Sequence, residues 1–447
     1  HNMEIAAKKL YGNRSIINSS IVYRGKLFNF FEKIKEKWYS GRIHNKENRK
    51  YVSMFIFVKR QYIFLLLAGM GIASACIALL SPWQALAAII FLIGAVAAIF
   101  RPEAILFFLA LYLPLEPFFL KFIPDEIYLY SRFFSEVLIY VLLVNVFLQI
   151  FLQKKRFVFT PLDPYFAGFV LLLGISIIAN QVPLSVGVLG VRQIIRFILL
   201  FYAVAYLAPS KDFMKKLATG MLVIVFFESF LGIAQAVSGG ALDAFLLPSA
   251  RKFYESIQLT SGTIQFWESG QRVFATLGRY DQLGTFLSFF LLLTVGWLWS
   301  VRKHGNKLIF WTVLVFGLAA LGLTYSRASW FGFVFGFLAI GIFVKRDRRV
   351  ALGVLVGAML IGTYLFVSGI VVKNLIDVPS QTFAERFLEA FSYERWRGEY
   401  YGLGRVYFAV QTLTTVFPHS PIFGVGPGSY GGGAAAALHN TKVYDTL

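Results

Sequence analysis

The fold is decided by the stretch LIFWTVLVFGLAALGLTYSRASWFGFVFGFLAIGIFV, residues 308–344. It contains two apolar runs, 308–325 and 328–344, and each approaches the ~20 residues that a helix needs to cross a bilayer. Backbone groups in lipid must be hydrogen-bonded within their own segment, so runs of this length are helices. Almost no residues lie between the two runs, and Arg327 is one of them. The stretch therefore predicts two membrane spans joined by a tight hairpin.

Similar apolar runs continue on both sides of this hairpin. The chain is 57% hydrophobic and only 15% charged, whereas soluble domains carry roughly a quarter charged residues. By length and hydropathy we predict about eleven spans, at 61–80, 84–100, 104–120, 133–153, 163–179, 192–208, 213–237, 281–300, 308–325, 328–344 and 350–371. The predicted class is an all-α, polytopic membrane helix bundle. It has a basic tail at 1–60, the bundle at 61–371 and an outward-facing helical loop at 372–447.

The net charge of +20 would indicate nucleic acid in a soluble chain. In a membrane protein it indicates cationic loops on the cytoplasmic face, so we expect no nucleic-acid partner. In the tail, apolar residues recur at helical spacing opposite lysines: Leu27, Phe30, Phe31, Ile34 and Trp38. This pattern predicts an amphipathic helix lying on anionic membrane lipids, with a target-binding helix as the alternative. The single cysteine, Cys76, excludes an intrachain disulfide.

The orientation follows from lysine and arginine in the short connections. If the tail is cytoplasmic, every strongly basic short connection falls on the cytoplasmic side: Arg101, Lys154, Lys155, Arg156, Lys211, Lys215, Lys216, Arg302, Lys303, Lys307, Lys345, Arg346, Arg348 and Arg349. The short connections on the other side, 81–83, 121–132, 180–191 and 326–327, carry few cations. Two long segments, 238–280 and 372–447, fall on the same side, so we expect them outside.

Arginines on the predicted outer face depart from this charge rule: Arg192, Arg196, Arg272, Arg279, Arg327 and Arg405. Arg192 and Arg196 are one helical turn apart at the start of the span 192–208, so they face the same way. Such arginines can snorkel to lipid head groups or pair with Glu228, Glu268, Asp281 or Glu399. As a set they outnumber those acids, and guanidinium forks match phosphate oxygens. We therefore predict an outward-facing site for a lipid-linked phosphate or pyrophosphate.

The end of the chain combines a helix, a rigid turn and a histidine. An apolar-periodic helix pattern begins at Arg405, the turn GVGPGSYGGG follows at 424–433, and His439 comes shortly after it. An imidazole titrates near pH ~6.5 and can take a proton from a hydroxyl nucleophile. A surface histidine in a loop is the alternative. The turn has no preceding strand and no Gly-Lys-Ser/Thr ending, so it is not a phosphate-binding loop.

We expect neither a metal nor another cofactor. The chain has no HExxH pattern, and the acidic pair Asp125 and Glu126 has no third ligand at a suitable spacing.

Three segments resemble the O-antigen ligase and polymerase family of membrane glycosyltransferases. They are RVFATLGRYDQLGTF at 272–286, LTYSRASWFG at 323–332, and FPHSPIFGVGPGSY at 417–430 with His439 and Asn440. The resemblance implies a C-type glycosyltransferase-like fold in the bacterial inner membrane with a periplasmic active site. The donor would be a glycan on undecaprenyl pyrophosphate, and the acceptor a hydroxyl of lipid A–core or another glycan.

The resemblance also implies roles for particular residues. His439 would be the general base, and Arg272, Arg279 and Arg327 would hold the pyrophosphate with help from Arg192, Arg196 or Arg405. Fixed positive charge on the departing pyrophosphate would replace a metal. Attack by the acceptor hydroxyl would then proceed in line, with inversion.

A ligase is the favoured function, and a polymerase that uses the same donor is the alternative within the family. An anion transporter is the alternative from another class. Transporters commonly show paired interrupted helices in two related halves, and we find no such halves in this sequence. The charged residues also lie towards one face of the predicted bundle.

Overall fold

The computed structural model describes residues 80–151, 159–248, 253–254, 257–258, 270–300, 304–368, 372–375, 383–402, 404–430 and 443. Nearly all of them belong to one unit of the chain, Pro82–Leu447. The predicted tail helix, the predicted span at 61–80 apart from Leu80, and His439 lie outside the described residues. The predicted division at residues 60 and 371 stays a prediction.

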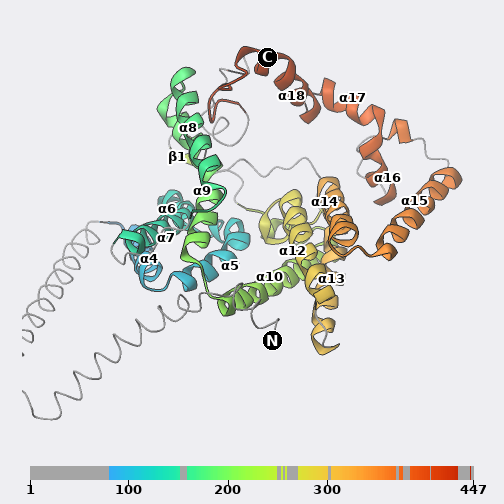
Figure 1. The fold of residues 1–447 in the computed structure, drawn as a ribbon, viewed down its shortest axis with the longest axis horizontal. Helices are drawn as coiled ribbons and strands as arrows, with labels where there is room; N and C mark the ends of the chain where they lie inside the picture. Colours follow the sequence, from blue (N-terminus) through green and yellow to red (C-terminus); the bar gives the residue numbers. More distant parts are fainter. Residues whose placement is uncertain are drawn as a thin grey trace, which may run out of the picture. The chain divides into compact units, whose positions relative to one another are not determined.

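The described chain is almost entirely helical, which confirms the all-α class (Figure 1). The first helices are α4 (Pro82–Phe100), α5 (Pro102–Leu120), α6 (Asp125–Arg132), α7 (Phe134–Phe151), α8 (Asp163–Ala179), α9 (Leu184–Leu207), α10 (Lys211–Val237) and α11 (Asp243–Leu246). After them come the antiparallel two-residue strands β1 (Phe253–Tyr254) and β2 (Ile257–Gln258), with Phe253 opposite Gln258.

The second half begins with the 3₁₀ turn η1 (Ala275–Leu277) and four long helical segments. These are α12 (Tyr280–Ser300), α13 (His304–Leu323), α14 (Arg327–Leu338) with its π-helical continuation η2 (Ala339–Val344), and α15 (Arg348–Ser368). Short elements follow: η3 (Val372–Asn374), α16 (Phe383–Leu388), η4 (Glu389–Phe391), α17 (Tyr393–Tyr401), α18 (Arg405–Gln411), the π-helical turn η5 (Thr412–Val416) and α19 (Phe417–His419).

Seven of the described helical segments are long and apolar enough to cross a membrane. They are Pro82–Phe100, Pro102–Leu120, Asp125–Phe151, Leu184–Leu207, Lys211–Val237, Tyr280–Ser300 and Arg327–Val344. The other predicted spans within the described chain coincide with α8, α13 and α15, of which α8 and the apolar part of α13 are shorter. The chain is a multi-pass membrane protein, and the total number of its spans stays a prediction.

The span predicted at 192–208 begins earlier than its sequence suggests. Helix α9 starts at Leu184, directly after Pro183, so the predicted outer connection 180–191 is mostly helical. Arg192 and Arg196 consequently lie within the helix and not at its start. The prediction was wrong because it treated the two arginines as a boundary, whereas a carboxylate on α7 partners both of them.

Two groups of helices each enclose an apolar core. One core lies among α10, α12, α13 and α14 and includes Val225, Leu283, Leu287, Leu291, Val313, Leu314, Ala320 and Leu321. The other lies among α4, α5, α7 and α9 and includes Ala98, Leu106, Leu109, Leu138, Ile139, Leu142 and Ala203. Small residues allow close approach: a Cβ at Gly284 of α12 would collide with Ser329 of α14.

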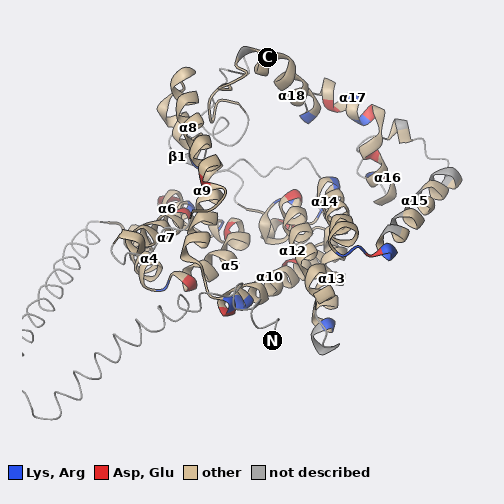
Figure 2. Ribbon diagram, in the orientation of Figure 1, with Lys and Arg blue, Asp and Glu red and all other residues tan. Residues whose placement is uncertain are grey.

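The basic connections lie at helix ends. Figure 2 shows lysine and arginine gathered at the start of α10, where Lys211, Lys215 and Lys216 lie, and between α14 and α15. The second group contains Lys345, Arg346, Arg348 and Arg349. Both groups were assigned to the cytoplasmic side from the sequence, and this orientation stays a prediction.

Residues 273–277 depart from the sequence-based expectation. They belong to the predicted outer segment 238–280, yet Val273, Phe274, Ala275, Thr276 and Leu277 are all buried. The side chains of Val273, Ala275 and Leu277 form part of the α10–α12–α13–α14 core, and η1 packs against α5, α10 and α12. A short irregular segment is therefore built into the helix bundle.

Candidate functional site

The arginines predicted to bind an anion fall into three groups, defined by their partners. The first group is Arg192 and Arg196 on α9. Arg192 Nε and Nη2 each donate to the Glu136 carboxylate at 2.6 Å, and Arg196 Nη1 donates to Glu136 Oε1 at 2.9 Å. Glu136, near the start of α7, is almost fully buried. The prediction that both arginines face one way is confirmed, because one carboxylate receives both.

Aromatic side chains also lie against Arg192 and Arg196, and they add no negative charge. Phe133 lies 4.2 Å from the Arg192 guanidinium carbon, and Phe197 lies 4.4 Å from that of Arg196. Aromatic faces stabilise guanidinium groups at such distances. The buried Nε of Arg196 has no hydrogen-bond partner among the described residues. Two guanidinium groups therefore share one carboxylate, and part of their donor capacity is unused.

The second group is Arg272 and Arg279, which flank the buried segment 273–277. The Arg272 guanidinium carbon lies 4.6 Å from the ring of Tyr280. Arg279 is half-exposed and forms a two-pronged pair with Asp281, from Nε at 3.0 Å and from Nη2 at 3.1 Å. The alternative that an outer arginine pairs with Asp281 is thus confirmed for Arg279. Such an exposed pair contributes little stability, ~0–1 kcal/mol.

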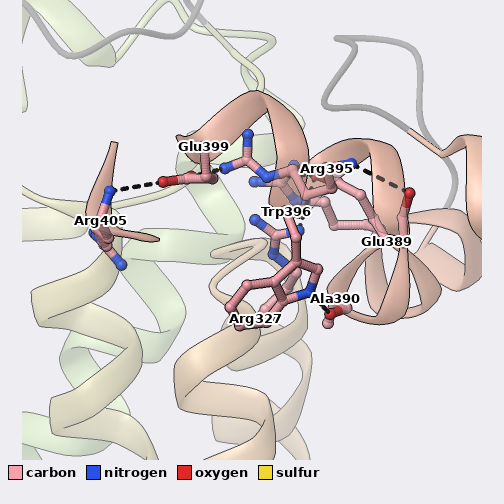
Figure 3. A network of polar contacts seen from close by, with 9 residues as sticks. Arg327, Glu389, Ala390, Arg395, Trp396, Glu399 and Arg405 are labelled. Carbon is pink, nitrogen blue, oxygen red and sulfur yellow. Dashed lines mark hydrogen bonds and ion pairs between the residues drawn. The ribbon is translucent and has the colours of Figure 1, made fainter. Parts of the chain in front are cut away.

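The third group surrounds Glu389, a residue with no exposed surface. Arg327 at the start of α14 lies 2.9 Å from Glu389 Oε1, and Arg395 of α17 lies 3.0 Å from the same oxygen (Figure 3). Arg386 of α16 lies 2.8 Å from Oε2. Three guanidinium groups from three helices therefore meet one buried carboxylate. The Arg327 side chain is 19% exposed and that of Arg386 is 5% exposed. Arg327 is the more accessible of these two to a ligand.

Glu399 extends this third group to Arg405. One oxygen of Glu399 pairs with Arg395, and the other accepts the backbone N–H of Arg405 at 2.8 Å (Figure 3). A carboxylate at a helix N-terminus satisfies an otherwise free N–H and favours the helix dipole. Glu399 therefore joins α17 to α18. Arg405 begins α18, as predicted, and its backbone is part of the network.

An apolar pocket lies beside the third group. Its volume is ≈ 570 Å³, and it is lined by residues of α13, α14, α15 and α16: Leu318, Leu321, Gly322, Trp330, Phe333, Val334, Leu360, Tyr364, Phe383, Ala384, Phe387 and Leu388. Trp330 is one helical turn after Arg327, and Leu388 directly precedes Glu389. Guanidinium groups and a hydrocarbon-lined pocket therefore share the same helices.

The glycine-rich turn docks on the hairpin formed by α8 and α9. The hydroxyl of Ser176 donates to the carbonyl of Phe423 at 2.5 Å. A Cβ added at Gly190 would overlap the backbone of Gly428, and one added at Gly426 would overlap Val182. Gly426 also has a positive φ of 94°, which favours glycine. The turn that precedes His439 in the sequence thus touches α9 at Gly190.

The residues of the predicted site are only partly brought together. Arg192 and Arg196 share one partner, and Arg327 joins a cluster that continues through Glu399 to Arg405. Arg272 and Arg279 hold their own partners near the start of α12. Among the described residues there is no group of three or more His, Cys, Asp or Glu side chains suited to a metal ion. The role of His439 stays a prediction.

Sequence reasoning missed several central residues: Glu136, Glu389, Arg386 and Arg395. An isolated acid in the apolar run 133–153 is costly without a partner, and this cost was a usable signal for Glu136. The spacing of Arg386 to Glu389 and of Arg395 to Glu399 is that of ion pairs on a helix surface. No local pattern indicates that Arg327 would join them.

The fold and the arginine groups define the class of this chain. It is a multi-pass helical membrane protein with clustered arginines partly neutralised by buried carboxylates. Residues 312–446 match the family model described as O-antigen ligase, which confirms the predicted resemblance to that family. The matched region contains Arg327, Glu389, Arg405, the glycine-rich turn and His439. No significant match was found among curated proteins or solved structures.

Proposed function

We propose that this protein is an O-antigen ligase. It transfers a glycan from undecaprenyl pyrophosphate to a hydroxyl of lipid A–core in the assembly of lipopolysaccharide. The observation that carries the proposal is the position of the O-antigen ligase match, which covers the Arg327–Glu389 cluster and His439 together. The family includes polymerases that use the same donor, so the acceptor is the part of the proposal that most needs a test.

The arginines supply the charge that this reaction requires. Breaking the bond between sugar and pyrophosphate leaves negative charge on the departing oxygens. Preorganised guanidinium groups stabilise that charge without the cost of reorganising water. Arg327 is suited to this role because it is partly exposed and belongs to a cluster in which three guanidinium groups share one carboxylate. Arg192, Arg196, Arg272, Arg279 and Arg405 supply further positive charge on the predicted outer face.

The acceptor hydroxyl needs a base, and His439 is the proposed one. The hydroxyl proton passes to the imidazole as the oxygen attacks the anomeric carbon. The bond from that carbon to the pyrophosphate oxygen breaks on the opposite side, so the configuration inverts. General-base catalysis contributes about 10²–10⁴ to such a rate. Neither a metal nor another cofactor has a part in the proposal.

The apolar pocket beside Arg327 supports a lipid-linked donor. Its lining side chains come from four helices and are almost entirely hydrocarbon or aromatic. A prenyl chain in this pocket would keep its phosphate groups near the α14 end that carries Arg327. A water-soluble nucleotide sugar has no comparable apolar part.

The proposal places the protein in the bacterial inner membrane with the site facing the periplasm. The distribution of lysine and arginine supports this orientation. A cysteine probe at position 380 should react with a membrane-impermeant reagent added from outside, whereas a probe at position 40 should not. The reverse labelling would contradict the orientation and the location of the site.

The test of function is the lipopolysaccharide pattern of cells that lack this protein. A ligase predicts loss of all long chains on lipid A–core, together with accumulation of polymer on the carrier lipid. A core that carries a single repeat unit would instead identify a polymerase. An unchanged pattern, with no lipid-linked polymer, would overturn both assignments.

A further inference from the structure

The buried segment between Arg272 and Arg279 is held by side chains of α10. Phe274 and Ala275 have no exposed surface, and Thr276 is almost completely buried. Ala275 has a positive φ of 47°, which residues other than glycine rarely adopt. An irregular backbone of this kind is tolerated inside a membrane protein only where its polar groups find partners. The partners of these N–H groups therefore decide whether the segment keeps its position.

Gln235 of α10 satisfies two of these groups. Its Oε1 accepts the backbone N–H of Phe274 and that of Ala275, each at 3.0 Å. Its Nε2 donates to Asp243 Oδ1 at 2.7 Å, and the other oxygen of Asp243 accepts the N–H of Gly270 at 2.9 Å. Gln235 is 1% exposed. Asp243 holds the Nε2 end of the Gln235 amide, so Oε1 of Gln235 points towards the segment 273–277.

Glu228, two helical turns earlier on α10, satisfies the next residue. Oε2 of Glu228 accepts the backbone N–H of Thr276 at 3.1 Å, and Oε1 accepts its hydroxyl. The N–H of Val273 donates to the carbonyl of Leu323 at 3.3 Å, at the end of α13. Consecutive N–H groups from Val273 to Thr276 thus all have protein acceptors. Most of these acceptors are polar side chains of one membrane-spanning helix.

Glu228 and Gln235 place a carboxylate and an amide inside the membrane-spanning helix α10. A buried carboxylate or amide in a spanning helix lowers stability when its partners are incomplete. Here the partners are nearly complete, and the residues that they hold carry Arg272 on one side and Arg279 on the other. Arg272 lies against Tyr280, the first residue of α12. The position of both arginines therefore depends on a segment whose backbone α10 holds.

We propose that Gln235 and Glu228 are positioning residues of the anion site. They hold the segment 273–276 so that Arg272 and Arg279 meet the pyrophosphate of the donor in a fixed geometry. This inference rests on the proposed function, because it assumes that these arginines bind the donor. Glu228 acts through its hydrogen bonds to Thr276.

The inference predicts a particular order among variants of α10. Gln235→Leu and Glu228→Leu each remove acceptors of the segment, so the purified full-length protein should bind undecaprenyl pyrophosphate about tenfold more weakly. Glu228→Gln should keep near-normal affinity, because an amide oxygen accepts the Thr276 N–H while the hydroxyl turns to accept from the amide nitrogen. Ser229→Ala is the matched control. Ser229 is equally buried on α10, and within the part of the chain that the structure describes its hydroxyl donates to the Val225 carbonyl of its own helix.

A double-mutant cycle separates positioning from general stability. The variant Arg272→Ala/Arg279→Ala should weaken binding of undecaprenyl pyrophosphate about tenfold or more, and adding Gln235→Leu to it should cost less than about twofold more. Full additivity would overturn the inference, because Gln235 would then act independently of both arginines. Wild-type affinity of Gln235→Leu beside a weakened Arg272→Ala would also overturn it.

Two further outcomes are informative. If the leucine variants do not fold, Thr276→Val removes the hydroxyl bond to Glu228, together with the longer 3.5 Å contact of that hydroxyl with the Pro114 carbonyl, and leaves the backbone bonds of the segment in place. It should still weaken binding severalfold, and unchanged binding there would contradict the inference. If Arg272→Ala and Arg279→Ala bind as the wild type does, the proposed role of these arginines fails, and the inference fails with it. The lipopolysaccharide pattern of deletion cells is a separate readout of the function itself.

Discussion

The Glu136 and Glu389 clusters both pair several arginines with one buried carboxylate, but different parts of the fold hold the two clusters in place. In both clusters one buried carboxylate receives more than one guanidinium group. Glu136, Arg192 and Arg196 lie on α7 and α9, two long helices that share the apolar core of Leu138, Leu142 and Ala203. In the Glu389 cluster, Arg386, Glu389 and Arg395 lie on short elements that bury few residues, and α17 buries none.

The support of the Glu389 cluster comes from aromatic contacts and from the ion pairs themselves. Tyr325 stacks on Phe383 with ring centres 4.7 Å apart, and Phe331 lies 4.9 Å from Phe387. These contacts bring α16 to α14. Helix α17 reaches the same cluster through Arg395. Helix packing therefore positions the first arginine pair, whereas Glu389 positions the second set.

The largest expected effect separates charge from base catalysis. Both clusters present guanidinium groups, which stay protonated at neutral pH. His439→Ala should therefore lower turnover by about 10²–10⁴ while leaving binding of the lipid-linked donor intact. Turnover and binding are measured on the purified protein, with His304→Ala as the control because His304 lies on the predicted cytoplasmic side. More than about a tenth of wild-type turnover in His439→Ala would show that His439 is not the base.

The next effect concerns Glu389. In Glu389→Gln, three guanidinium groups lose their shared charge, and Arg386 is almost fully buried. Breaking a buried ion pair costs about 3–5 kcal/mol, so we expect a lower midpoint of thermal unfolding and faster proteolysis of residues 372–447. Glu394→Gln is the matched control, because Glu394 pairs with Arg397 at 3.8 Å near the surface. Equal stability of the two variants would contradict the positioning role of Glu389.

A smaller effect is expected at Arg327. Arg327→Lys keeps the charge and loses the planar fork, so activity should fall roughly tenfold to hundredfold with normal expression. Arg349→Lys, in the first turn of α15, should be nearly silent. Transfer to lipid A–core in membranes is the measurement. Equal tolerance at both positions would indicate that Arg327 only pairs with Glu389 and has no part in the transfer.

The smallest effect is expected at Glu136 and sharpens the comparison directly. Arg192 and Arg196 are 25% and 36% exposed, so water or a ligand phosphate can partly replace the lost carboxylate. Glu136→Gln should therefore lose about 1–3 kcal/mol of the free energy of unfolding. Its midpoint of thermal unfolding should fall by less than that of Glu389→Gln. A loss as large as that of Glu389→Gln would show that the α7–α9 core does not hold these arginines by itself.

Much of this protein follows from the sequence alone. The apolar runs determine the helices because a backbone in lipid must bond within its own segment. The hairpin at Arg327, the helix beginning at Arg405 and the turn at 424–430 follow from local composition, and the structure contains all three. The family resemblance also depends on short continuous segments, and the match over 312–446 confirms it.

The tertiary structure determines which polar groups meet. Arg192 pairs with Glu136, Arg327 pairs with Glu389, and the backbone N–H of Thr276 donates to Glu228, each across tens of residues of sequence. It also decided that α9 starts at Leu184 and that residues 273–277 are buried. Periodicity and composition describe a residue's own segment, whereas the cost of a buried charge depends on a partner supplied by another helix. The packing of the helices therefore determines whether an arginine is neutralised, shared or available to a ligand.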